Sequence, residues 1–185
     1  MEKIIKTVAS EIQEVLGRVD TDEAIRLADE LNQVKRIFVA GTGRSGLIGK
    51  VFAMRLMHSN FPIYVVGETI TPSIKTGDLL VLISGSGSTG SLVQYAEKAK
   101  EIDAKVALVT TNKDSAIGRI SDFLLTIPAA TKKRLPSEPD TIQPLGSQFD
   151  QSAHLLLDAI IVYLLEQQPE GNSHSKLNQK HANLE

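Results

Sequence analysis

The sequence contains two similar loops, FVAGTGRSG at residues 38–46 (the first loop) and LISGSGSTG at residues 82–90 (the serine loop). Each places an apolar, strand-like run directly before a Gly-x-Gly-x-x-Gly pattern, and a helical pattern follows. Glycines let the backbone approach a ligand closely, and the free N–H groups at the start of a helix attract an anion. Two such loops predict a binding site at the carboxyl ends of neighbouring parallel strands.

Five apolar runs alternate with helix-length segments outward from these loops. They occupy residues 37–40, 63–66, 79–84, 106–110 and 123–127. Strands separated by helices form parallel sheets that are covered on both faces. The pattern therefore predicts an α/β fold, a three-layer αβα sandwich around a five-stranded parallel sheet.

Further helices are expected at both ends of this pattern. Residues 1–34 carry apolar side chains at helical spacing and predict an N-terminal lead-in of two helices, the second capped by Thr21 or Asp22. A short helix is expected around residues 116–120. A last helix is expected over residues 147–167, where an apolar face recurs at helical spacing.

The composition fits one globular domain. The 185 residues are 42% hydrophobic and 23% charged, which is enough apolar material for one core. We expect a single domain over residues 1–168, with its α/β core at 35–168. A polar tail follows at 169–185, and its simplest interpretation is a disordered terminus.

Charge and residue counts exclude several classes of protein. A net charge of -2 gives no overall basic field for a nucleic acid or an anionic membrane, and no segment approaches the roughly 20 apolar residues of a membrane span. Residues 1–19 do not match the pattern of a signal peptide. Without cysteine there is no thiolate metal site, and the histidines show no metal-ligand spacing. We expect a cytoplasmic protein without a metal or a nucleic-acid or membrane partner.

The serine loop is rich in hydroxyl groups, at Ser84, Ser86, Ser88, Thr89 and Ser91. A bound pyrophosphate would need mainly bare backbone, whereas hydroxyls together with helix N–H groups suit a terminal phosphate monoester. Simple capping of a helix that begins near Ser88 is the structural alternative, but one hydroxyl would suffice for it. The loop therefore predicts a phosphate cradle.

Several longer segments resemble the 6-phospho-3-hexuloisomerase family of the sugar isomerase (SIS) fold. They are GTGRSG, FAMRLMH, VVGETITPSIKTGDLLVLISGSGSTGS, IQPLGSQFDQ and the closing HANLE, so the resemblance covers essentially the whole chain. It implies a flavodoxin-like sandwich and interconversion of D-arabino-3-hexulose 6-phosphate and D-fructose 6-phosphate, a step of formaldehyde fixation in the ribulose monophosphate pathway. It also implies no cofactor, and a homo-oligomer, a dimer or tetramer with sites near subunit boundaries.

The resemblance also implies site residues. The first loop supplies Ser45 as a substrate contact, and the phosphate cradle comprises Ser84, Gly85, Ser86, Gly87, Ser88 and Thr89. Where the family pattern is expected to carry a glutamate as proton acceptor, as in GSLFEQ, this chain has GSQFDQ with Asp150. Aspartate keeps the carboxylate but shortens its reach by one methylene. The alternative for Asp150 is an ordinary acid at a helix N-terminus, favoured by the helix dipole.

Five other residues are candidates, and three of them have an ordinary alternative. Arg44 is expected to stabilise an enediolate or to form a surface ion pair. His58 is expected to assist ring opening or to be structural, and Glu68 to bind sugar hydroxyls or to be an exposed loop acid. His181 and Glu185 in the tail are expected to cover a neighbouring subunit's site.

Other functions remain open on the sequence alone. A non-catalytic sugar-phosphate-binding SIS module and an isomerase of another phosphosugar, such as arabinose 5-phosphate, share the same loops. The first loop, with Glu68 about 20 residues further on, also fits a fragment of an NAD-binding dehydrogenase, although the chain lacks a substrate domain. The Pro-rich stretch at 128–144 is either functional or mobile. Its basic residues 132–134 are expected to be solvated or to attract an anionic substrate.

Overall fold

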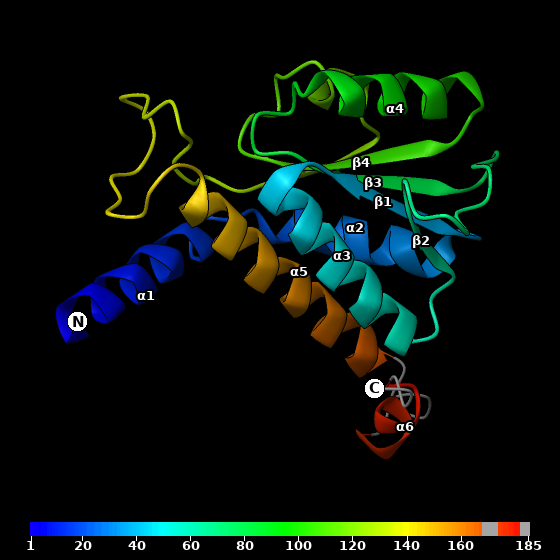
Figure 1. Ribbon diagram of the computed structural model, residues 1–185, viewed down its shortest axis with the longest axis horizontal. Coiled ribbons are helices and arrows are strands. Elements are labelled where there is room, and N and C mark those ends of the chain that lie inside the picture. Colours follow the sequence, from blue (N-terminus) through cyan, green and yellow to red (C-terminus); the bar gives the residue numbers. More distant parts are fainter. Residues whose placement is uncertain (168–173, 182–185) are drawn as a thin grey trace.

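The fold is built around a parallel sheet (Figure 1). The computed structural model describes residues 1–167 and 174–181. Its strands pair in the order β2-β1-β3-β4-β5, and every pair is parallel. This flavodoxin-like order places the crevice where the order reverses, beside β1 and β3. The strands are β1 (Ile37–Gly41), β2 (Ile63–Val65), β3 (Leu79–Ile83), β4 (Lys105–Thr110) and β5 (Phe123–Thr126), which confirms the predicted sheet.

Helices cover both faces of the sheet and complete the predicted three-layer sandwich. In Figure 1, α4 lies on one side of the sheet, and α2, α3 and α5 lie on the other, with α1 extending outward beside α5. The elements are α1 (Glu2–Leu16), α2 (Thr21–Gln33), α3 (Gly43–His58), α4 (Gly90–Glu101), the 3₁₀ helix η1 (Gly118–Ile120), α5 (Ser147–Gln167) and α6 (His174–Gln179).

Alternate strand residues supply the two halves of the core. Val39 and Val81 pack with the layer of α2, α3 and α5, whereas Phe38 and Leu80 point to the opposite face, toward α4. Burial on both faces explains why the strands are continuously apolar instead of alternating. All five residues of β3 are buried.

Some predicted boundaries are corrected by the structure. The cap of α2 is Asp20, whose carboxylate accepts a hydrogen bond from the Asp22 N–H at 2.9 Å, and it is neither Thr21 nor Asp22. The reason is that the helix already begins at Thr21, so the capping residue is the one before it. Helix α4 begins at Gly90 and not near Ser88.

The C-terminal part is only partly described. The predicted last helix matches α5, and a second short helix, α6, lies within the stretch expected to be a disordered tail. Glu185 lies outside the described residues, and the division between a domain at 1–168 and a tail at 169–185 stays a prediction. Among residues 1–167 and 174–181, no helix is long and apolar enough to cross a membrane.

Candidate active site

A cavity of about 870 Å³ lies at the carboxyl ends of the strands. The first loop contributes Arg44 and Ser45 to its lining, the serine loop contributes Ser84, Gly85, Ser86 and Thr89, and α5 contributes Asp150. The two loops meet here because β1 and β3 are neighbours in the sheet. Open parallel sheets bind their ligands at this position.

Two glycines in the first loop let α3 start directly against the end of β1. A Cβ atom on Gly41 would lie 2.9 Å from the Gly46 nitrogen, and one on Gly46 would lie 2.8 Å from the Gly41 carbonyl oxygen. Any larger residue at either position would push the helix away from the strand. The close approach places Arg44 and Ser45 in the first turn of α3, at the cavity wall.

The serine loop is held in shape by the end of β4. The carbonyl oxygen of Gly85 accepts hydrogen bonds from the Thr111 N–H at 3.1 Å, from the Thr111 hydroxyl at 2.8 Å and from the Thr110 hydroxyl at 3.1 Å. A trans peptide points its N–H opposite to its C=O. The Ser86 N–H belongs to the same peptide group as the Gly85 carbonyl, so it points away from β4. Ser86 is one of the residues that line the cavity.

The N-terminus of α4 faces this loop with its first-turn N–H groups. Thr89 is the capping residue, but its side chain makes no capping hydrogen bond, and the first turn carries no acidic residue. The hydroxyl of Ser84 accepts a hydrogen bond from the Gly87 N–H at 3.1 Å, and so supports the loop. The hydroxyls therefore do not serve to cap α4, and the helix dipole remains available to an anion.

Asp150 joins the first loop to the start of α5. Its Oδ1 accepts a hydrogen bond from the Ser45 hydroxyl at 3.0 Å, and its Oδ2 lies 2.7 Å from Nε of Arg44. The Asp150 side chain is 13% exposed, whereas that of Arg44 is 49% exposed. Arg44 also donates to the Ser147 hydroxyl at 3.2 Å. Arg44 therefore forms an ion pair inside the site and not merely on the surface.

The start of α5 also contacts the serine loop. A Cβ atom on Gly85 would lie 3.2 Å from the ring of Phe149, so the ring packs directly on the loop backbone. Asp150 contacts the first loop, and Phe149 contacts the serine loop. The first turn of α5 therefore fixes both loops relative to each other. The structure thus brings together Arg44, Ser45, the serine loop and Asp150, as predicted.

Two predicted site residues lie elsewhere in this chain. Glu68 pairs with Lys50 at 2.7 Å, and neither residue is part of the cavity lining, which matches the alternative of an exposed loop acid. His58 is the last residue of α3. At about 1.5 Å of rise per residue it lies roughly 20 Å along the helix from Ser45. Within one chain, His58 does not reach Asp150.

His58 instead stacks on His181, with ring centroids 5.5 Å apart and an angle of 27° between the rings. Burial lowers the pKa of His58, and the nearby charges of His181, Arg55 and Lys180 lower it further. The two histidines predicted at separate places are therefore neighbours at the far end of α3.

Sequence reasoning missed the contribution of β4. Thr111 and Asn112 line the cavity next to the serine loop. The signal for this pair was present, since a strand followed by Thr-Thr-Asn places polar side chains at the same sheet edge as the loops. Lys132 and Lys133 line the cavity from the Pro-rich stretch, where the second of their two expected roles, attraction of an anionic substrate, would require them.

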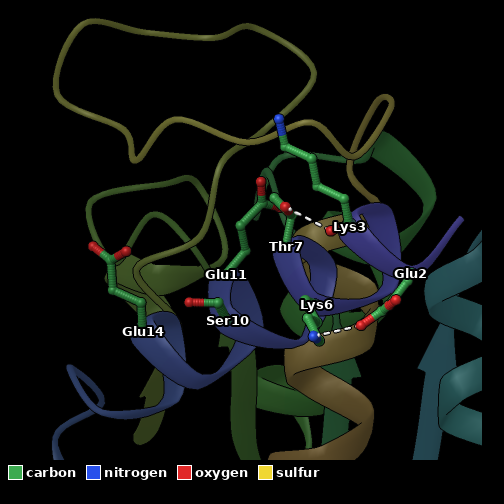
Figure 2. A pocket seen from close by; sticks show the side chains of 7 residues that line it. All are labelled: Glu2, Lys3, Lys6, Thr7, Ser10, Glu11 and Glu14. Carbon is green, nitrogen blue, oxygen red and sulfur yellow. Dashed lines mark hydrogen bonds and ion pairs between the residues drawn. The ribbon is translucent and has the colours of Figure 1, made fainter.

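A second hollow of about 530 Å³ runs along α1 (Figure 2). All its lining residues, from Glu2 to Glu14, come from this one helix. A site that positions a substrate needs groups from several elements that converge on one point. We therefore place the candidate active site in the larger cavity.

The fold and the cavity define a parallel α/β protein with its site at the carboxyl ends of the strands. A family model of the SIS domain matches residues 30–143. The 3-hexulose-6-phosphate isomerase of Bacillus subtilis is 40% identical over 181 residues, which cover 98% of this chain and 97% of that protein. The protein of the same name from Mycobacterium gastri is 39% identical, covering 98% of this chain and 89% of that protein.

A solved structure agrees with these relatives. The crystal structure of a Methanococcus jannaschii protein, for which a 3-hexulose-6-phosphate isomerase function has been inferred, superposes with a TM-score of 0.85 at 32% identity and covers 100% of both chains. The chain belongs to the SIS domain family and, within it, to the family of these relatives. The resemblance found in the sequence is thereby confirmed.

Proposed function

We propose that this protein is an isomerase that interconverts D-arabino-3-hexulose 6-phosphate and D-fructose 6-phosphate. The relatives from Bacillus subtilis and Mycobacterium gastri carry the name of this activity and match nearly the whole chain. The observation that carries the proposal is the carboxylate of Asp150, held by Ser45 and Arg44 in the same cavity as the serine loop. The reaction belongs to formaldehyde fixation in the ribulose monophosphate pathway.

The substrate's phosphate binds at the serine loop in this proposal. Ser86 and Thr89 are hydroxyl-bearing residues of the cavity lining, and the N-terminus of α4 adds N–H donors without an acidic neighbour. A phosphate monoester with two negative charges gains from both features. Gly87 and Ser88 are not among the lining residues, and they hold the loop in shape: the Gly87 N–H donates to the Ser84 hydroxyl, and Ser88 donates through its N–H to the Ser86 hydroxyl and through its own hydroxyl to the Ser86 carbonyl oxygen, both at 3.3 Å.

Asp150 serves as the base. Moving the carbonyl from C3 to C2 requires removal of the proton on C2, a cis-enediol intermediate, and return of a proton to C3. One carboxylate performs both transfers when the two carbons present the same face to it. Ser45 fixes one oxygen of Asp150, which orients the carboxylate toward the bound sugar.

Arg44 stabilises the negative charge that develops on the enediolate oxygens. Its guanidinium is half exposed at the cavity wall and already lies against Asp150, within reach of groups that approach this carboxylate. A preformed donor that needs no reorganisation is the most effective kind of electrostatic stabilisation. No metal or organic cofactor is required for this proton transfer.

We further propose that the enzyme works in the cytoplasm as a homo-oligomer. Large apolar side chains are exposed on α1, α3 and α5, among them Ile5, Leu47 and Leu155. A second copy of the chain covers such surfaces and can bring its His58 and its tail to a neighbouring site. A role of His58 in ring opening requires this second copy, because the residue lies far from Asp150 in its own chain.

A coupled assay tests the proposed activity. The 3-hexulose 6-phosphate is generated in place from formaldehyde and ribulose 5-phosphate by a separate synthase, and formation of fructose 6-phosphate is followed. We expect turnover that depends on this protein and persists after treatment with a metal chelator. No turnover, with fructose 6-phosphate still bound, would contradict the proposal and indicate a non-catalytic phosphosugar-binding module.

A further inference from the structure

The segment between β5 and α5 (residues 128–146, the connecting segment) forms one wall of the cavity. Thr131, Lys132, Leu135 and Glu138 are among its lining residues. The segment contains no helix or strand, so isolated backbone turns and side-chain hydrogen bonds fix its shape. It leads directly into the first turn of α5, which carries Asp150.

Hydrogen bonds inside the connecting segment tie its two arms together. The carboxylate of Glu138 accepts from the Thr131 N–H at 2.9 Å, from the Thr131 hydroxyl at 2.6 Å and from the Leu135 N–H at 3.2 Å. The guanidinium of Arg134 donates to the carbonyl oxygen of Gln143. The segment is therefore a folded loop and not a loose connection.

Two residues outside the segment fasten it to helices: Gln148 on α5, whose Oε1 accepts a hydrogen bond from the Ala130 N–H at 2.7 Å, and Glu11 on α1. The carboxylate of Glu11 accepts three hydrogen bonds from the segment: from the Thr141 hydroxyl at 2.5 Å, from the Ile142 N–H at 2.8 Å and from Nε2 of Gln143 at 2.9 Å. Figure 2 shows the Glu11 side chain rising from α1 toward this chain segment, on the side of the helix that also carries Thr7.

Both ends of this attachment lie next to buried residues. Ile12 and Val15, on the same helix as Glu11, are buried, and Val15 belongs to the core that includes α5. On the other side, Gln143 is only 4% exposed. Glu11 therefore connects a helix that is anchored in the core to a buried point of the segment.

The attachment lies close to the proposed base. The Ser147 N–H donates to the Pro144 carbonyl at 3.1 Å, and the Asp150 N–H donates to the Gly146 carbonyl at 3.0 Å, so the chain is continuously hydrogen-bonded from residue 144 to Asp150. A displacement of residues 141–143 would therefore move the first turn of α5. A misplacement on the order of 1 Å can cost about 100-fold in rate.

We propose that Glu11 is a positioning residue of the isomerase: through Thr141, Ile142 and Gln143 it sets the place of the connecting segment and, through it, of Asp150. The inference rests on the proposed role of Asp150 as the base. Glu11 touches neither the substrate nor the cavity lining, and it acts only through the segment that it holds.

The substitution Glu11→Gln tests this inference. Glutamine keeps the size of the side chain but has one acceptor oxygen in place of two, so it cannot satisfy three donors. We expect kcat to fall about tenfold or more, while KM and the affinity for fructose 6-phosphate stay within about twofold, because the serine loop is untouched. Trypsin should also cut faster after residues 132–134. Glu2→Gln, on the same helix but with its carboxylate paired with the exposed Lys6, is the control and should match the wild type.

The substitution Thr141→Val provides a second, milder test if Glu11→Gln folds poorly. It removes one of the three donors, and its loss in kcat should be smaller and non-additive with that of Glu11→Gln. Wild-type kcat in Glu11→Gln, with or without faster cleavage, would overturn the inference, as would additive effects of the two substitutions. The rate of tryptic cleavage reports on the connecting segment and does not depend on which residue is the base. An active Asp150→Asn variant would contradict the proposed role of Asp150, and the two failures can therefore be told apart.

Discussion

Asp150 and Arg44 illustrate how the site is prepared before a substrate arrives. The carboxylate is largely buried and has one hydroxyl and one guanidinium as partners, 3.0 Å and 2.7 Å away. The guanidinium is half exposed, so it remains able to contact an incoming oxyanion. The aspartate side chain is shorter than that of the glutamate in the expected family pattern. It already has close neighbours on the first loop, because both partners come from the first turn of α3.

Gly87 is a residue whose replacement should disrupt the serine loop. Its φ angle is +59°, and a Cβ atom would lie 2.0 Å from the Ser115 hydroxyl oxygen. We expect Gly87→Ala to lower the free energy of unfolding by roughly 1–3 kcal/mol, as overpacking does, and to weaken binding of fructose 6-phosphate. Urea unfolding and calorimetry measure the two effects.

Gly90→Ala is the matched control for this prediction. Gly90 lies at the start of α4, its φ angle is not in the left-handed region, and a Cβ atom there would meet nothing within 4 Å. We expect its stability to equal or slightly exceed that of the wild type. Equal stability of the two variants would contradict the role assigned to Gly87.

At the scale of single residues, sequence reasoning found the groups that belong to a motif and missed those that depend on packing. The serine loop follows from the two Gly-x-Gly patterns, and Ser45 and Asp150 follow from the longer resemblance. Thr111 lies beside the serine loop because β4 pairs with β3, and the order of strands is not written in a local pattern. His58 was assigned to the site because it follows the first loop, but a helix of 16 residues carries it to the opposite end.

Among the elements, the strands were easier to predict than the helix ends and the connecting segment. Continuous apolar runs leave few alternatives in a sheet that is buried on both faces. The identity of the α2 cap changes when the start of the helix shifts by one residue. Apolar periodicity does not locate a helix start that closely. The contact of the connecting segment with Glu11 spans about 130 positions in the chain, and a local sequence pattern does not indicate such a contact.

The connecting segment should loosen in acid. Burial raises the pKa of Glu11 and of Glu138, but hydrogen bonds from the segment and the charge of Arg134 outweigh it, so both pKa values lie below the ordinary 4.5. A carboxyl with a lowered pKa in the folded state adds stability that is complete above its unfolded pKa and is lost as the pH falls through the folded pKa.

Urea unfolding of the wild type and of Glu11→Gln at several pH values tests this prediction. The wild type should be the more stable near pH 6, and the difference should shrink as the pH falls below about 4.5, because protonation removes the charge that the variant already lacks. A difference that stays constant from about pH 6 to pH 3 would show that the charge of Glu11 does not contribute.

For the whole molecule, the exposed apolar surface argues for assembly. Ile5 on α1 is 61% exposed and Leu155 on α5 is 48% exposed, and the two helices are neighbours (Figure 1). We expect Ile5→Glu to shift the sedimentation of the protein to a smaller species, since a charge cannot be buried without a partner. Ile70→Glu is the control, because this 87% exposed residue lies on the connection between β2 and β3. An unchanged mass for Ile5→Glu would exclude α1 from an interface.

In the proposed reaction Asp150 moves a proton between C2 and C3 of a phosphorylated hexulose, and proton exchange on fructose 6-phosphate measures this transfer. The sugar is incubated in D₂O with the wild type or with Asp150→Asn, and NMR follows deuterium at C3. We predict exchange with the wild type, and a rate lower by about 100-fold or more with Asp150→Asn, although that variant still binds the sugar. Equal rates for the two proteins, or no exchange with the wild type, would contradict this proposal.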